Sequence, residues 1–267
     1  MTKTTKRLAS IIAAIAIMLS VICVAGVTNA SADTDRVSLY YRDLKYSWMY
    51  KDSDVHYDIY VQTRGTASNE AVTVHYYKDY VGGWKDAEAE YVTTLNDGSK
   101  IWKAAAGGNE GFRFAIKYEA DGQVFWDNNN GNDYLGAGTA ENYGSRLGTA
   151  PIMAERRTYF DNYSSTKEYP INAILQNYAY NKNVFVRYTT DNWATYTDKA
   201  LSYDSTNADG TENWNTTVTV EEGRYYNSDI YTAAEGFEYA ICYQVNGQTY
   251  WANNLGSNYD GTYYLHG

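Results

Sequence analysis

The segment FRFAIKYEADGQVFWDNNNGNDY, at residues 112–134, recurs at residues 237–259 as FEYAICYQVNGQTYWANNLGSNY. The two occurrences align at a constant offset of 125 residues without a gap, and 11 of the 23 aligned positions are identical. Upstream, the interval from Tyr91 to Trp102 equals that from Tyr203 to Trp214. This internal similarity predicts two copies of one domain of about 100 residues.

Each copy carries the periodicity of β-strands. Phe237, Tyr239, Ile241 and Tyr243 alternate with other residues, and positions 112–118 follow the same pattern. The dipeptides at 121–122 (Asp-Gly) and 246–247 (Asn-Gly) are strong hairpin signals. No stretch after residue 32 has a convincing helical period, so we expect an all-β protein of two tandem immunoglobulin-like antiparallel β-sandwich modules.

Residues 1–32 have the features of a signal peptide. A basic start is followed by an almost wholly apolar run from Leu8 to Val27, and Ala30-Ser31-Ala32 favours cleavage before Asp33. The apolar run is long, so an uncleaved membrane anchor is the alternative. Behind the leader we expect a first module at 33–139, a flexible linker at 140–156 and a second module at 157–267.

Charge and cysteine content exclude several classes of function. The leader holds three of the 22 basic residues and none of the 32 acidic ones, so the remaining chain is more acidic than the formal net charge of −10. Nucleic acid and anionic membrane need basic patches, and neither is expected as a partner. Cys242 is the only cysteine outside the leader, which excludes a disulfide within the exported chain and a thiolate metal site. We expect a secreted monomer, extracellular or associated with the cell surface, without metal or cofactor.

Three motifs of the second copy carry a family resemblance: NVFVRYTTDNW at 183–193, FEYAICY at 237–243 and QTYWANNLGSNY at 248–259. Together they resemble the family 21 starch-binding modules, which occur in fungal glucoamylases and in glycogen-targeting subunits of protein phosphatase 1. The likeness covers nearly all of the second copy and, in the first, the strand at Val72 and the block 126–134. It implies non-catalytic binding of starch, glycogen or malto-oligosaccharides, with avidity from two modules.

The resemblance also implies where the sugar binds. One family site is an aromatic pair, which falls on Trp193 and Trp251 in the second module and on Trp84 and Trp126 in the first. A third aromatic of some members falls on Ala115 and Ala240. The other site combines tyrosines with loop asparagines, which in the second module are Tyr180, Tyr203, Asn253, Asn254 and Asn258. The first module offers Tyr91, Asn128 and Asn129, with Ser68 and Asp133 at two of the matching positions, so we expect a weaker second site there.

Other interpretations remain beside this one. An extracellular adhesin or assembly component could use the same sandwich to bind another glycan or a protein. The loop 127–133 resembles a calcium loop but lacks the closing Glu, which favours a structural turn. The segment RVSL at 36–39 resembles the phosphatase-docking motif of the glycogen-targeting subunits, with Leu in place of Phe. No nucleophile–base set or duplicated acid pair emerges, so an enzyme is not expected.

Overall fold

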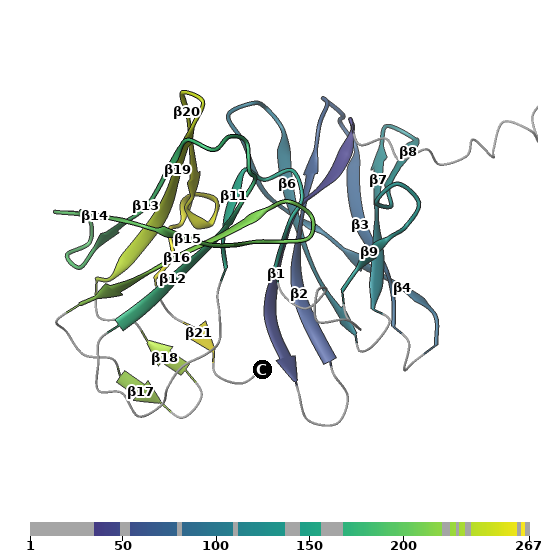
Figure 1. Ribbon diagram of the computed structural model, residues 1–267. Coiled ribbons are helices and arrows are strands. Elements are labelled where there is room, and N and C mark those ends of the chain that lie inside the picture. The colour runs from purple at the N-terminus through teal and green to yellow at the C-terminus, as the bar shows by residue number, and fades with distance from the viewer. Residues whose placement is uncertain are drawn as a thin grey trace, which may run out of the picture.

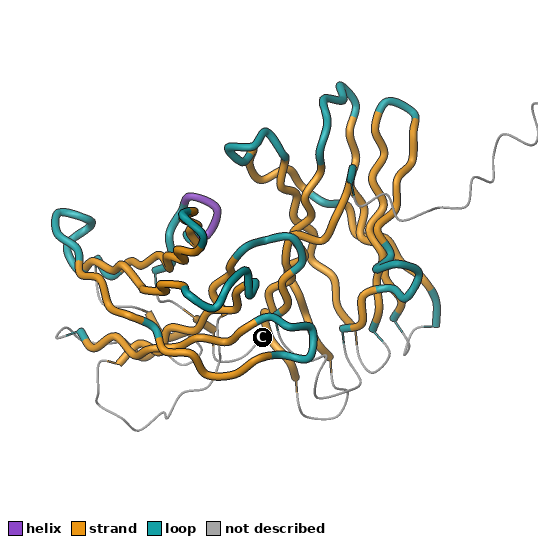
Figure 2. Tube along the Cα trace, turned by 45° about the horizontal axis from the view of Figure 1, so that its top comes forward, coloured by secondary structure: helices purple, strands orange, loops and turns teal. Residues whose placement is uncertain are grey.

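The computed structural model describes residues 35–48, 54–78, 82–108, 112–136, 145–155, 168–220, 225–227, 230–232, 236–260 and 263–264. Over these residues the chain consists of antiparallel β-strands joined by turns, with a short 3-10 helix, η2 (Asn254–Gly256), after β20 (Figure 2). The all-β class predicted from the sequence is confirmed. The predicted signal peptide lies outside the described residues.

The N-terminal sheet pair, as we call the first two sheets, is formed by residues up to 147. Its first sheet has the order β10-β1-β2-β6-β5 and its second the order β4-β3-β7-β8, with β9 beside β7 (Figure 1). The strands are β1 (Val37–Trp48), β2 (Asp54–Thr63), β3 (Glu70–Tyr77), β4 (Trp84–Glu88), β5 (Glu90–Thr94), β6 (Lys100–Gly108), β7 (Arg113–Ala120), β8 (Gln123–Asp127), β9 (Tyr134–Leu135) and β10 (Arg146–Leu147).

The C-terminal sheet pair repeats this arrangement with residues from 152 onward. Its sheets have the orders β11-β12-β16-β15 and β14-β13-β19-β20, and a small sheet β17-β18-β21 lies below them in Figure 1. The strands are β11 (Ile152–Glu155), β12 (Glu168–Leu175), β13 (Lys182–Thr189), β14 (Thr197–Ala200), β15 (Ser202–Thr206), β16 (Glu212–Thr219), β17 (Tyr225–Asn227), β18 (Ile230–Thr232), β19 (Glu238–Val245), β20 (Gln248–Ala252) and β21 (Tyr263–Tyr264).

Each pair of sheets encloses its own apolar core. In the C-terminal pair, Ile171 on one sheet and Val186 and Ile241 on the other belong to one buried cluster. In the N-terminal pair, Ile59 on the first sheet and Ile116 on the second belong to another buried cluster. The side chains that alternate with these residues lie on the opposite face of each sheet, as the period-two pattern predicts, and several of those on β2, β7 and β19 are also buried. Two sheets that share a core in this way form a β-sandwich.

The predicted hairpins occur where the sequence placed them. Asp121 and Gly122 have φ angles of 47° and 81°, and Asn246 and Gly247 have 50° and 75°. Two successive positive φ angles are characteristic of the type I′ turn, whose twist matches that of the two strands joined by a two-residue hairpin. The first turn joins β7 to β8 and sets the register in which Trp126 lies opposite Lys117. The second turn joins β19 to β20 and places Trp251 opposite Cys242.

Residues 145–155 differ from the flexible linker expected there. β10 pairs with β1 of the N-terminal pair, and β11 pairs with β12 of the C-terminal pair. The apolar residues between and within these strands are buried, with Leu147 4% and Met153 2% exposed. Their burial against both sandwiches orders a segment that the sequence pattern gave no reason to call structured.

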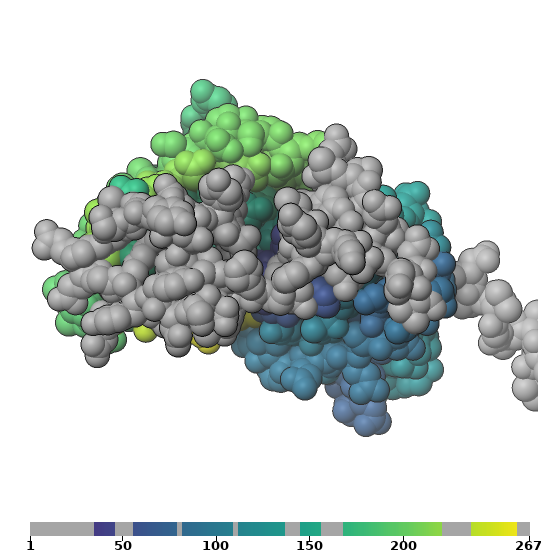
Figure 3. Space-filling view, turned by 90° about the horizontal axis from the view of Figure 1, so that it is seen from below, coloured from purple at the N-terminus to yellow at the C-terminus, as the bar shows by residue number. Residues whose placement is uncertain are grey.

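The two sheet pairs lie side by side in Figure 1, and Figure 3, seen from below, shows the green atoms of the C-terminal pair beside the blue and teal atoms of the N-terminal pair. The Gln176 side chain donates to the Gly148 carbonyl at 2.8 Å, and Arg146 lies 3.8 Å from the carboxylate of Asp209. A third buried cluster, which we call the interface cluster, draws on both sheet pairs. Its buried members are Tyr41, Tyr60, Ile101, Leu147, Ala150, Met153 and Ile174, with Tyr40, Leu95 and Leu255 packed against them.

Within the described part of the chain, no helix has the length and apolarity needed to span a bilayer.

Candidate functional site

An exposed tryptophan marks the outer face of the sheet β14-β13-β19-β20. Trp251 on β20 is 40% exposed, and its ring meets the Phe185 ring edge-on at 6.0 Å between centroids. The guanidinium of Arg187 lies 5.5 Å from the centre of the Trp251 ring. We call this surface, with Trp193 at its end, the C-terminal aromatic face. A rigidly held, half-exposed indole is a surface on which an apolar ring face can stack.

Arg187 orients this face. Its Nε and Nη2 donate to the two carboxylate oxygens of Asp198, each at 2.7 Å, and its guanidinium lies 4.1 Å from the centre of the Tyr196 ring. The hydrogen bonds to Asp198 raise the pKa of Arg187 above its usual value. A planar guanidinium fixed by a bidentate carboxylate holds its neighbouring rings in place better than a flexible cation would.

Trp193 is held at the other end of this face by a strained turn. Asn192 and Trp193 both have positive φ angles, 55° and 67°, and the Trp193 amide donates to the hydroxyl of Thr189 at 3.0 Å. Its indole Nε1 donates to Oε2 of Glu238. Positive φ is costly in a bulky residue, and this turn holds the half-buried Trp193 indole beside Glu238.

Glu238 links Trp193 to the asparagine loop. The side-chain amide of Asn258 donates to Oε2 of Glu238 at 3.1 Å, the same oxygen that accepts from the indole. Two predicted site residues from distant parts of the chain thus meet at one carboxylate. Glu238 lies four residues from Cys242, which pairs with Trp251, and this corresponds to about 13 Å along β19. Trp193 and Trp251 therefore lie near opposite ends of the face, with Ala240 between them on β19.

The other loop asparagines shape their own turn. The Asn253 side chain accepts from the Gly256 amide at 3.2 Å, and the Asn254 side chain donates to the Asn258 carbonyl at 3.0 Å. Asn254, Leu255 and Asn258 have positive φ angles, a conformation that asparagine tolerates and leucine does not favour. Leu255 packs against the interface cluster, which therefore supports this loop.

The predicted tyrosines of the second site are exposed. Tyr180, in the connection before β13, is 97% exposed, and Tyr203 on β15 is 53% exposed. The Tyr203 ring packs edge-on against Trp214 at 6.0 Å, and its hydroxyl lies 2.8 Å from that of Thr206. Tyr91 has the same environment in the N-terminal pair, 5.8 Å from Trp102 and 53% exposed. Edge-on packing orients each tyrosine while leaving ring surface in solvent.

In the N-terminal pair, a histidine brings the two predicted tryptophans together. The Trp84 and His75 rings stack in parallel at 4.6 Å, and Trp126 meets the His75 ring edge-on at 5.9 Å. Nδ1 of His75 lies 2.5 Å from a carboxylate oxygen of Asp86. Trp84 is 41% exposed, much as Trp251 is. We call this surface the N-terminal aromatic face.

The N-terminal asparagine loop is also engaged in its own turn. The Asn128 side chain accepts from the Gly131 amide and the Asn129 side chain donates to the Asp133 carbonyl, both at 2.9 Å. Buried Asp127 accepts from the Leu39 amide at 2.8 Å and from the Tyr134 hydroxyl at 2.7 Å. Burial and the nearby Asp127 raise the pKa of Tyr134 far above its usual value. With Asp127 used in this way, the loop fits a structural turn, and no group of potential metal ligands occurs among the described residues.

Sequence reasoning missed three residues of these faces. Arg187, Glu238 and His75 lie on strands, at positions that face solvent, and each contacts a predicted tryptophan. Each contact involves a tryptophan on another strand or turn, so it can be recognised only in the folded structure. The outward alternation along β13 and β19 was the one signal that could have singled out Arg187 and Glu238.

Comparison with known proteins gives a family match in the C-terminal part of the chain. Residues 157–261 match the family described as carbohydrate/starch-binding module (family 21). The matched region contains Trp193, Trp251, Tyr180, Tyr203 and the asparagine loop. The family was the one suggested by the sequence, and the match covers one copy.

Two curated relatives are similar to part of this chain. The chain is 35% identical over 85 residues to protein phosphatase 1 regulatory subunit 3B of Bos taurus, covering 32% of this chain and 28% of the relative. It is 27% identical over 108 residues to glycogen-binding subunit 76A of Drosophila melanogaster, covering 40% of this chain and 14% of the relative. The alignments thus span under a third of these relatives.

Among solved structures, the carbohydrate-binding module of the muscle glycogen-targeting subunit of protein phosphatase-1 aligns at a TM-score of 0.32 and 24% identity, covering 43% of this chain and 76% of that one. The starch-binding domain of Rhizopus oryzae glucoamylase aligns at a TM-score of 0.27 and 22% identity, covering 35% of this chain and 89% of that one.

Proposed function

We propose that this chain is a secreted, non-catalytic α-glucan-binding protein composed of two tandem immunoglobulin-like modules. The observation that carries the proposal is the C-terminal aromatic face, which lies within the region matching the carbohydrate/starch-binding family. Trp251 and Trp193 would stack on the apolar faces of glucose units, and Asn253, Asn254 and Asn258 would bind hydroxyls at the loop. Tyr180 and Tyr203 would form the second site of this module.

The physical chemistry of this face suits a neutral sugar. A pyranose has an apolar face of C–H groups and a rim of hydroxyls. Covering the apolar face with an exposed ring removes hydrocarbon from water and stabilises the complex by about 1–2 kcal/mol per ring. Asparagine both donates and accepts, so one amide can bridge two neighbouring hydroxyls.

The N-terminal aromatic face would supply a second attachment point. Trp84 and Trp126, with Tyr91, Asn128 and Asn129, would bind another part of the same polymer. The interface cluster supports a fixed rather than a flexible relation between the two modules. Two weak sites on one body gain avidity on a multivalent polymer such as starch or glycogen when their geometry matches it.

We do not propose that this chain binds protein phosphatase 1, although the names of several relatives refer to that enzyme. The segment that resembles the docking motif lies at the start of β1, where Val37 is 0% and Leu39 1% exposed. A docking peptide must offer such side chains to its partner, and these two are part of the N-terminal core.

The test is native electrophoresis of the full chain through gels with and without amylopectin. We expect strong retardation of the parent and reduced retardation of the Trp193→Ala/Trp251→Ala variant. Val124→Ala, which removes another exposed apolar side chain, is the control and should behave as the parent. Absence of retardation in the folded parent would refute α-glucan binding and direct the search to other glycans or a protein partner, as for an adhesin.

A further inference from the structure

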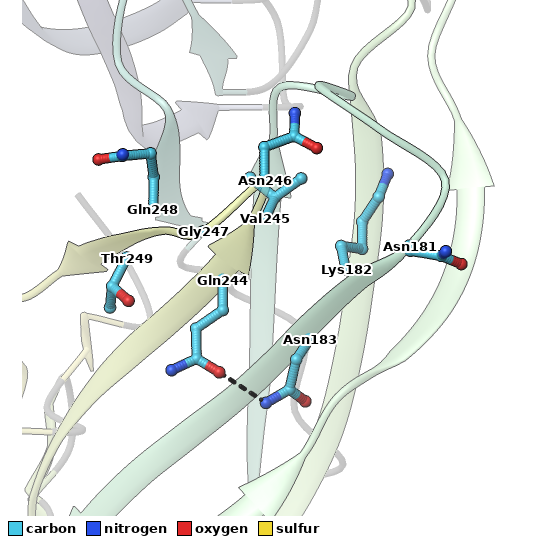
Figure 4. Close-up of a pocket in the computed structure, with 9 residues that line it drawn as sticks. All are labelled: Asn181, Lys182, Asn183, Gln244, Val245, Asn246, Gly247, Gln248 and Thr249. Carbon is cyan, nitrogen blue, oxygen red and sulfur yellow. Dashed lines mark hydrogen bonds between the residues drawn. The ribbon is translucent and has the colours of Figure 1, made fainter.

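A neutral, amide-lined cavity lies beside the C-terminal aromatic face, at the tip of the β19–β20 hairpin. Its volume is about 490 Å³, and it is broadly open to solvent. Its polar lining comes from Asn181, Asn183, Gln244, Asn246, Gln248 and Thr249 (Figure 4). None of these residues belongs to the sites described above.

Asn183, Gln244 and Thr249 form one row across three strands, which we call the amide row. Asn183 on β13 pairs with Gln244 on β19, and Gln244 pairs with Thr249 on β20. All three side chains are exposed and extend to the same side of the sheet in Figure 4. The Asn183 amide donates to the Gln244 carbonyl oxygen at 3.0 Å. That bond orients both groups and leaves the Asn183 oxygen as an acceptor and the Gln244 amide as a donor.

The amide row continues the C-terminal aromatic face. Two residues further along each strand, the next row on the same side is Phe185, Cys242 and Trp251. Two residues correspond to about 7 Å, so a chain stacked on Trp251 reaches the amide row only with units beyond those that contact the ring. A sugar chain stacked on Trp251 would therefore pass over the amide row when it extends toward the hairpin.

The cavity is electrically neutral toward a ligand. Lys182 contributes to its wall, but the Lys182 ammonium donates to Glu212 at 2.7 Å and to Asn177 at 2.6 Å, and this side chain is 2% exposed. In Figure 4 Lys182 points away from the side occupied by Asn183 and Gln244. Amides without a net charge suit a neutral polyhydroxyl ligand rather than an anion.

The N-terminal sheet pair lacks this feature at the equivalent positions. There the row is Ala71, Glu119 and Val124, in the same register on β3, β7 and β8. Glu119 forms an ion pair with Lys117 at 2.9 Å, and Val124 is 51% exposed. The amide row is therefore specific to the C-terminal pair and is not a requirement of the scaffold.

We propose that the amide row is a further subsite, which binds the hydroxyls of glucose units that extend beyond Trp251. This proposal rests on the α-glucan function proposed above and adds to it a preference for longer chains. The Asn183 oxygen would accept from one hydroxyl and the Gln244 amide would donate to another, with Thr249 beside them.

Calorimetric titration of the full chain with maltotriose and with maltoheptaose tests the proposal. The titrations use the Trp84→Ala/Trp126→Ala background, so that the N-terminal face does not contribute. Adding Asn183→Ala/Gln244→Ala should weaken maltoheptaose binding roughly three- to tenfold and change maltotriose binding by less than about twofold. Glu119→Ala, at the equivalent position of the N-terminal row, is the matched control and should change neither.

The outcomes separate the two proposals. If the background protein binds neither sugar, the α-glucan function itself fails for the C-terminal face. If it binds both, with loss on Trp251→Ala, but the amide variant binds both as before, the subsite is refuted and the function stands. If the amide variant binds both sugars more weakly by the same factor, a subsite for units beyond Trp251 is also refuted. As an independent readout, the side-chain amide NMR signals of Asn183 and Gln244 should shift with maltoheptaose and not with maltotriose.

Discussion

Trp193 and Asn258 donate hydrogen bonds to the same oxygen atom, Oε2 of Glu238. One carboxylate thereby joins the strained turn after β13 to the asparagine loop after β20. The turn that carries Trp193 and the loop that carries Asn258 therefore lie side by side on one surface. Glu238 holds them together without itself having to contact the sugar. Glu238 is in this sense a positioning residue.

Replacing Glu238 tests this relationship. Glu238→Ala should weaken malto-oligosaccharide binding about five- to tenfold, because both side chains lose their common acceptor. Glu238→Gln keeps an acceptor oxygen, so its affinity for malto-oligosaccharides should fall only about twofold. Calorimetry measures both, with the exposed Glu168→Gln on β12 as control. Equal affinity of Glu238→Ala and the parent would show that the link does not position the site.

His75 should have a similar role in the N-terminal aromatic face. In a Trp193→Ala/Trp251→Ala background, His75→Ala should lower the remaining retardation by amylopectin, because Trp84 loses the ring on which it stacks. His75→Phe retains a ring but loses the contact with Asp86, and it should retain most of the retardation. If the Ala and Phe variants behave alike, ring stacking is not what positions Trp84.

The interface cluster should couple the stability of the two modules. Leu147 is 4% exposed, so Leu147→Ala should lower the free energy of unfolding by about 2–4 kcal/mol. Leu135→Ala is the matched control, because Leu135 is 45% exposed and its loss should have little effect. Differential scanning calorimetry of the parent should show one main transition. Two separate transitions in the parent would show that the modules unfold independently.

Tyr40 should make the interface sensitive to alkaline pH. Burial, and then the nearby Asp97 and Tyr178, raise the pKa of Tyr40 from 10.0 to about 12. Between pH 10 and 12 the unfolded chain releases this proton while the folded chain retains it, so stability falls as the pH rises. Tyr40→Phe cannot ionise, and its stability should fall less steeply over this window in denaturant titrations.

The control for this measurement is Tyr203→Phe, which removes an exposed hydroxyl away from the interface cluster. Its pH dependence should follow that of the parent. If Tyr40→Phe also follows the parent from pH 10 to 12, the Tyr40 hydroxyl does not contribute to the alkaline loss of stability.

Cys242 should be unreactive in the folded protein. It lies between Phe185 and Trp251 in the strand register and is 0% exposed, and burial raises the pKa of its thiol to about 11. Since the thiolate is the reactive form, a disulfide reagent at pH 8 should label the native chain slowly and the urea-unfolded chain at once. Rapid stoichiometric labelling of the native chain would contradict this burial.

Local patterns were enough to predict the strands that carry the candidate site. Alternation along 237–243 and the turn at Asn246-Gly247 placed β19 and β20, because side-chain period and turn conformation depend on neighbouring residues alone. Alternation left open whether Tyr250 or Trp251 faces outward, and the family resemblance selected Trp251. The structured segment 145–155 was not foreseen. Its strands have two and four residues, and they are stabilised by burial against both sheet pairs rather than by their own pattern.

The sequence by itself determined the all-β class and the repeated hairpin, since each follows from the order of residues within one or two strands. Only the tertiary structure decided that Glu238 accepts from both Trp193 and Asn258, that His75 stacks on Trp84, and that Leu255 packs against the interface cluster. These contacts join residues from separate strands and loops. They depend on strand pairing and sheet packing, whose geometry no local pattern encodes.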